Sequence, residues 1–87
     1  MTDKDKIDDI IEKEGDILEQ TEIKKDSRTY KIYLISLPYK DYSVKKIEIK
    51  GDGKYVLEEE VILKNQNMEA KARYTFHNMA VKTRREI

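Results

Sequence analysis

The 87-residue sequence contains no cysteine, one proline and three glycines. The absence of cysteine excludes a disulfide framework, cysteine-bound zinc and thiol catalysis. The sequence also has no apolar run near the ~20 residues that a membrane-spanning helix requires. We therefore expect a soluble, cytoplasmic protein that folds by packing alone, without a cofactor and without contact to a membrane.

Charged residues are abundant, with 18 Lys and Arg against 18 Asp and Glu. The sign alternates along the chain, because residues 1–22 and 51–69 carry an excess of acids whereas residues 23–50 and 70–87 carry an excess of bases. A formal net charge of zero provides no general attraction to polyanions. The length corresponds to a single domain over residues 1–87 with one thin hydrophobic core.

The first expected element is a short amphipathic helix over residues 3–14. Ile7, Ile10 and Ile11 have the i, i+3, i+4 spacing of one helix face. Gly15 stands where a helix commonly ends with a residue in the left-handed conformation. Because its apolar face has only three isoleucines, this helix needs a sheet to pack against.

After this helix, apolar residues alternate with polar ones, and β-branched and aromatic residues become frequent, as is typical of strands. The predicted strands cover residues 17–25, 28–37, 43–50, 54–64 and 69–81, and a short basic tail follows over residues 82–87. The expected fold class is α+β, with the N-terminal helix packed on a five-stranded antiparallel meander sheet in two layers.

The turns predict how the strands pair. A two-residue turn at 26–27, a three-residue turn over 51–53 and a loop over 65–68 would each join two consecutive strands. The predicted cross-strand pairs include Ile23 with Tyr30, Glu22 with Lys31, Ile47 with Leu57, Lys46 with Glu58, Leu63 with Ala70, and Val61 with Ala72. A slip of one residue would destroy this match of apolar with apolar and of opposite charges. The predicted inner face consists of Ile23, Tyr30, Ile32, Leu34, Ile47, Ile49, Tyr55, Leu57, Val61, Leu63, Tyr74 and Phe76.

Residues that could perform catalysis are few. His77 is the single histidine, and its neighbours in sequence supply neither a nucleophile nor an orienting carboxylate. Strand alternation would separate Glu59 from Glu58 and Glu60, which leaves no carboxylate cage for a metal. The segment 51–53 is a hairpin turn and not a phosphate-binding loop, since no helix is expected after it. We expect no enzymatic activity and no metal site.

More apolar residues remain than one short helix can cover, which favours an exposed surface that binds another protein. The candidate protein-binding residues are Leu18, Tyr33, Ile35, Leu37, Tyr39 and Tyr42. This pattern predicts a small non-catalytic protein-binding module, an adaptor, regulator or inhibitor of a larger protein machine, of a size that viral and phage genomes often encode. Its partner would be another protein or a second copy of itself. The open alternative is that residues 38–42 or the C-terminal segment fold back over this surface.

A second interpretation is a domain that binds single-stranded nucleic acid, because tyrosines stand beside basic residues on several predicted strands. The candidate residues for this function are Lys71, Arg73, Arg84 and Arg85. The zero net charge disfavours it, since phosphate contacts depend on an excess of cations.

Overall fold

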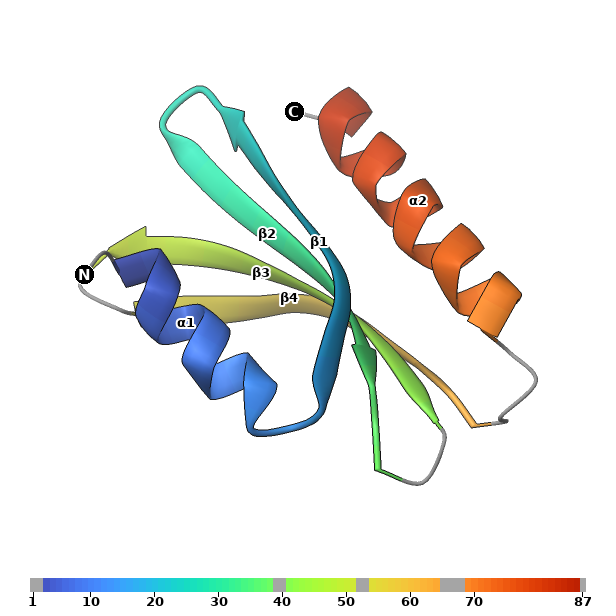
Figure 1. Cartoon of the computed structure of the whole chain (residues 1–87). Coiled ribbons are helices and arrows are strands. Elements are labelled where there is room, and N and C mark those ends of the chain that lie inside the picture. Colours follow the sequence, from blue (N-terminus) through green and yellow to red (C-terminus); the bar gives the residue numbers. More distant parts are fainter. Residues whose placement is uncertain (1–2, 39–40, 52–53, 65–68, 87) are drawn as a thin grey trace.

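The computed structural model describes residues 3–38, 41–51, 54–64 and 69–86. Its elements in chain order are α1 (Asp3–Glu12), β1 (Asp16–Lys25), β2 (Arg28–Ser36), β3 (Tyr42–Gly51), β4 (Lys54–Leu63) and α2 (Glu69–Glu86). The strands form one antiparallel sheet in the order β1-β2-β3-β4 (Figure 1). The fold class is α+β with an antiparallel sheet, as predicted, but the sheet has four strands among the described residues. The N-terminal helix begins at the predicted residue and ends at Glu12, before the predicted end.

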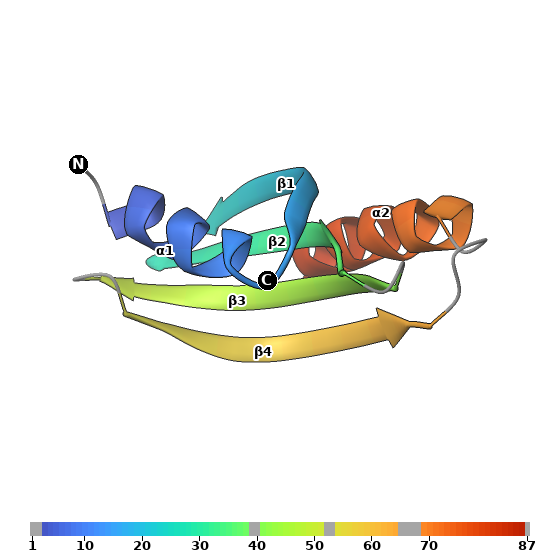
Figure 2. The same cartoon turned by 60° about the horizontal axis from the view of Figure 1, so that its bottom comes forward.

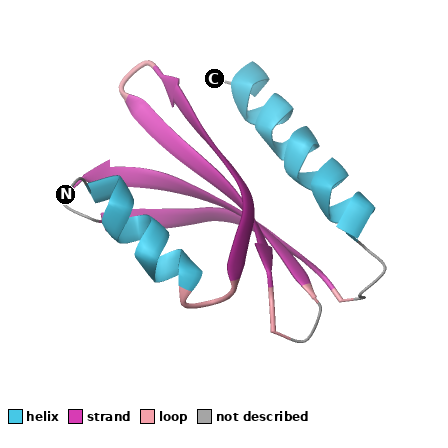
Figure 3. Cartoon of the chain, viewed as in Figure 1, coloured by secondary structure: helices cyan, strands magenta, loops and turns pink. Residues whose placement is uncertain are grey.

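The predicted fifth strand, residues 69–81, is wrong, because this segment belongs to the 18-residue helix α2 (Figure 3). Its buried residues have helical spacing and form one face that packs on the sheet: Ala72, Phe76, Met79, Ala80 and Thr83. Glu69 in the first turn and Arg84 and Arg85 in the last turn complement the helix dipole. The predicted tail over 82–87 is therefore, as far as Glu86, the last turn of α2.

The two helices pack on opposite faces of the sheet, so the domain has three layers and not the predicted two. Figure 2 shows α1 on the near side of the strands and α2 on the far side. The cluster on the α2 side consists of Ile23, Ile32, Leu34, Tyr42, Val44, Ala72, Phe76, Met79 and Ala80. The cluster on the α1 side consists of Ile7, Ile11, Tyr33, Ile35 and Ile47, with Ile17, Leu37, Ile49 and Tyr55 packed against it. Both faces of β2 are therefore buried.

The predicted inner face combined residues from these two sides. In the pairing of β2 with β3, Lys31 lies opposite Ile47 and Ile32 lies opposite Lys46. Ile47 therefore shares a face with Lys31 and Tyr33, and not with Ile32. Of the predicted inner residues, those on the α1 side are Ile47, Ile49, Tyr55 and Leu57. Tyr74 lies on neither buried face, because 67% of it is exposed on α2.

The two predicted hairpin registers around β1–β2 and β3–β4 are confirmed in their apolar pairs. Ile23 pairs with Tyr30, and Ile47 pairs with Leu57. Glu22 also pairs with Lys31 as predicted. A register shift after Lys46 places Lys46 opposite Glu59 rather than Glu58. The predicted pairs of Leu63 with Ala70 and of Val61 with Ala72 are wrong, since both alanines are helical.

Polar contacts as well as isoleucines fix α1 to the sheet. The Lys31 ammonium and the Tyr33 hydroxyl both donate hydrogen bonds to Asp8 Oδ1, at 2.7 Å and 2.5 Å. Beyond the end of the helix, Lys45 Nζ donates to both oxygens of the Glu14 carboxylate, at 2.6 Å and 2.7 Å. The side chains of both lysines are less than one-tenth exposed, so each buried cation has a carboxylate partner.

Within the described ranges, neither helix combines the length and the apolar character that crossing a bilayer demands.

Candidate functional site

The structure separates the residues that the sequence grouped as a protein-binding surface. Tyr33 and Ile35 have no exposed area, because α1 covers them, so the expectation that these two residues form an exposed surface is wrong. Leu37 is half-buried against the same cluster. The covering element is the N-terminal helix, which the sequence placed over the other face of β2. The C-terminal segment does not cover Tyr33, because α2 packs on the opposite face of the sheet. Residues 39–40 of the other candidate cover lie outside the described residues.

The remaining predicted residues lie apart from one another. Leu18 is 37% exposed at the register shift of β1. Tyr42 is buried on the α2 side, where its hydroxyl donates to Glu69 Oε1 at 3.4 Å. Desolvation and the Glu69 carboxylate raise the pKa of the Tyr42 hydroxyl. Tyr39 lies outside the described residues.

The basic residues proposed for nucleic-acid binding all lie exposed on α2, but on different flanks of it. Arg73 faces β1, where its guanidinium contacts the Glu19 carboxylate at 3.0 Å. Arg84 also lies on this flank, since its carbonyl accepts a hydrogen bond from Lys25 of β1. Lys71 lies on the opposite flank, beside β4. These cations therefore do not form one continuous strip.

Apart from Leu18 on β1, the exposed large apolar side chains of the described strands lie on β4, which pairs with β3 alone among these strands. Val56, Leu57 and Ile62 are 47%, 49% and 49% exposed. We call residues 56–62 the β4 edge. On its outer side the backbone N–H and C=O groups have no neighbouring strand in the described chain, and such an edge can accept one. In Figure 2 this edge lies on the far side of β3 from β1 and β2.

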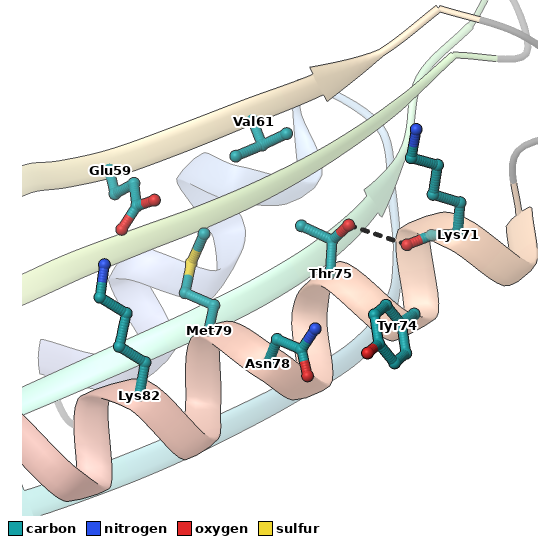
Figure 4. Close-up of a pocket in the computed structure, with 8 residues that line it drawn as sticks. All are labelled: Glu59, Val61, Lys71, Tyr74, Thr75, Asn78, Met79 and Lys82. Atoms are coloured by element: carbon teal, nitrogen blue, oxygen red, sulfur yellow. Dashed lines mark hydrogen bonds between the residues drawn. The ribbon is translucent and has the colours of Figure 1, made fainter.

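A groove lies beside the β4 edge, between β4 and α2. Its volume is about 340 Å³, near the lower end of the ~300–1,000 Å³ typical of ligand pockets. Figure 4 shows Val61 of β4 and Met79 of α2 on either side of it, with Tyr74 at the rim. One stripe of α2 at helical spacing completes the wall: Lys71, Thr75, Asn78 and Lys82. The groove exists because α2 packs on β1, β2 and β3.

The three consecutive glutamates of the β4 edge differ in their surroundings. Glu60 accepts a hydrogen bond of 2.9 Å from the Ser43 hydroxyl and lies 3.7 Å from Lys45 Nζ. Glu59 lies on the groove side and lines it. Glu58 is exposed at the register shift. The edge is therefore acidic at its centre and apolar at both ends.

The titratable residues singled out by the sequence for catalysis or a metal do not meet at the groove among the described residues. His77 is exposed on α2 and not on a strand, as the predicted fifth strand over 69–81 required. Within the described part of the chain, no three His, Asp or Glu side chains are placed to hold a metal ion. The groove wall offers two lysines, a threonine, an asparagine and one carboxylate.

Comparison of the chain with family models, with curated proteins and with solved structures finds no significant match.

Sequence reasoning missed the β4 edge and the groove, because it paired β4 with a fifth strand. One signal was available. Ala72, Phe76, Met79 and Ala80 have the i, i+4, i+7, i+8 spacing of a helix face. Reading residues 69–81 as a helix would have left β4 as the last strand of the sheet.

Proposed function

We propose that this chain is a small non-catalytic protein-binding module, an adaptor, regulator or inhibitor that contacts its partner through the β4 edge. The observation that carries the proposal is the exposure of Val56, Leu57 and Ile62, each close to half, on a strand whose outer side has no neighbouring strand among the described residues. Sheet edges of monomeric proteins are commonly protected, because an exposed apolar edge invites pairing with another chain.

The location of the cations favours a protein ligand over a nucleic acid. Arg73 is engaged by the Glu19 and Glu69 carboxylates, at 3.0 Å and 3.4 Å. The strand at the exposed edge carries three glutamates, which would repel a phosphate backbone. Tyr74 is the exposed tyrosine next to the groove, and a single ring is not a stacking platform for successive bases.

Affinity capture with matched variants tests the proposal. The purified chain, Ile62→Lys and Leu18→Lys serve as baits, and each captured protein is purified and its complex with each bait reconstituted. Leu18 is the control, because it is a similarly exposed apolar residue on β1, at the other edge of the sheet. We expect a partner whose affinity falls at least tenfold with Ile62→Lys and less than twofold with Leu18→Lys. Equal losses with the two variants, or no reconstituted complex, would contradict the proposal.

A further inference from the structure

The β4 edge has a specific order of charged and apolar residues along the strand. Glu58, Glu59 and Glu60 occupy its centre, with Leu57 before them and Val61 after them. Beyond the register shift at Glu58, residues on an added strand would face Glu59, Glu60 and Val61 one by one, at a spacing of ~4.5–5.5 Å between Cβ atoms. The edge therefore specifies which side chains a new neighbour can carry.

A second copy of this chain is a poor neighbour for β4. Antiparallel pairing of two β4 strands about their centre would place Glu58–Glu60 against the same three residues of the copy. Like charges directly opposite each other destabilise a strand pair, and here six carboxylates would meet. A strand with basic residues at these positions would instead gain opposite-charge pairs.

The groove adds a requirement on the α2 side of the sheet. Val61 and Glu59 point to this side, since Val61 packs against the core cluster there and the two residues are separated by two positions. A neighbour's side chain opposite Val61 would lie at the open side of the groove, which Val61 lines together with Met79 (Figure 4). An aromatic side chain in that position would bury apolar area of both proteins.

We propose that the β4 edge binds an extended segment of a partner protein as a fifth strand, with an apolar side chain directed into the groove beside Val61 and a basic side chain facing Glu59. This inference rests on the proposed function and names its ligand: an extended peptide with an apolar and a basic residue two positions apart. Strand addition of this kind draws affinity from main-chain hydrogen bonds and specificity from alternate side chains. Because Glu60 is already held by Ser43 and Lys45, the charge preference resides mainly at Glu58 and Glu59.

Synthetic peptides test the inference with the full chain. The probe TVFTRKVT, acetylated and amidated, places Phe opposite Val61 and Arg opposite Glu59 when it pairs antiparallel with β4. The comparison peptides are TVFTEEVT, TVATRKVT, and TVFTRKVT N-methylated at alternate residues so that it cannot form the ladder. Titration of ¹⁵N-labelled protein would report both the affinity and the location of each peptide.

We expect TVFTRKVT to perturb the amides of β4 and the groove wall of α2, and to protect β4 amides from hydrogen exchange. Reversing the charges or removing Phe should weaken binding at least fivefold each, and N-methylation should abolish it. The variant Glu59→Lys should reverse the preference between TVFTRKVT and TVFTEEVT, whereas Glu12→Lys on the exposed part of α1 should not change it.

Equal binding of the N-methylated peptide would overturn strand addition, and equal binding of the acidic peptide would overturn the charge preference. Perturbations on β1 instead of β4, no perturbation at millimolar peptide, or self-association of the chain through β4 would each refute the inference. In those cases a partner that depends on Ile62 in the capture experiment would still support the protein-binding module. Failure of both experiments would remove both proposals.

Discussion

The Tyr33 hydroxyl donates a hydrogen bond of 2.5 Å to the Asp8 carboxylate, which joins the centre of the sheet to the N-terminal helix. The same oxygen of Asp8 accepts a bond of 2.7 Å from the Lys31 ammonium, which lies 5.2 Å from the centre of the Tyr33 ring. Tyr33 is fully buried and Lys31 nearly so. This small network holds α1 over the apolar cluster that includes Tyr33, Ile35 and Ile47.

The network predicts that the stability of the domain falls at high pH. Burial raises the pKa of the Tyr33 hydroxyl, and the hydrogen bond to Asp8 raises it further. An unfolded tyrosine ionises near pH ~10, so above that pH the unfolded chain releases a proton that the folded chain retains. The contribution of Tyr33 is complete below about pH 10 and declines above it, by up to ~1.4 kcal/mol per pH unit.

Tyr33→Phe should remove the contribution of Tyr33 to the decline of the free energy of unfolding above about pH 10. It should also lower the free energy of unfolding by about 1 kcal/mol at neutral pH, through the lost hydrogen bond. Urea unfolding at a series of pH values measures both effects. Tyr74→Phe is the matched control, because the Tyr74 ring is 67% exposed. If the free energy of unfolding declines above pH ~10 as steeply in Tyr33→Phe as in the unchanged protein, the buried hydroxyl does not retain its proton.

Asp8→Ala should destabilise the domain by roughly 3 kcal/mol, because it leaves the buried Lys31 ammonium without its carboxylate. Asp9→Ala is the control, since Asp9 is the exposed neighbour on the same helix and its loss should cost within about 0.5 kcal/mol. Free energies of unfolding from urea titration measure the difference between the two variants. Equal losses would mean that α1 is held by its isoleucines alone.

Local patterns predicted the first four strands and the register of two hairpins, because turn residues and cross-strand pairs act over short sequence distances. Residues 37–41 connect β2 to β3, and within this connection the Leu37 N–H donates to the Asp41 carbonyl at 2.8 Å. No pattern in that segment set the register. As a result, Ile47 was assigned to the wrong face, and a register error of one residue exchanges the two faces of a strand.

The pattern of the C-terminal segment alone does not decide the candidate site, because the site depends on which elements lie side by side. Tyr33 has the composition of a binding residue, but its exposure depends on where α1 packs. The residues 70, 72, 74 and 76 satisfy a two-residue period, while 72, 76, 79 and 80 satisfy a helical one. Packing decides between the periods, since the helix buries Phe76 and Met79 on a face of the sheet that no other described element covers.

Gly15 has a structural role that differs from the predicted left-handed helix end. A Cβ at this position would lie 2.2 Å from the carbonyl oxygen of Ser36, so the link between α1 and β1 passes too close to β2 for any side chain. Gly15→Ala should therefore destabilise the domain by about 1–3 kcal/mol. Lys13→Ala, an exposed change in the same link, should cost less than about 0.5 kcal/mol in the same denaturation assay. An unchanged free energy of unfolding in Gly15→Ala would show that the backbone at Gly15 and at Ser36 can move apart at little cost.

Phe76 and Tyr74 distinguish the helical from the extended form of the C-terminal segment. In a strand, residues two positions apart share a face, so both side chains would be buried and both alanine variants would cost several kcal/mol. In α2 they point in different directions, with Phe76 9% exposed and Tyr74 67% exposed. Phe76→Ala should therefore cost about 3 kcal/mol and Tyr74→Ala less than about 1 kcal/mol.

If Phe76→Ala does not fold, Phe76→Leu replaces it in the comparison with Tyr74→Ala. This variant should lose less than about 1.5 kcal/mol of unfolding free energy and therefore stay measurable. Urea unfolding followed by circular dichroism gives all three values. Similar losses at positions 74 and 76 would favour the strand, and a fifth strand beside β4 would occupy the edge itself. The edge is open to a partner only if Tyr74 tolerates replacement. The helix that exposes Tyr74 is the same helix whose packing leaves the outer side of β4 without a neighbouring strand among the described residues.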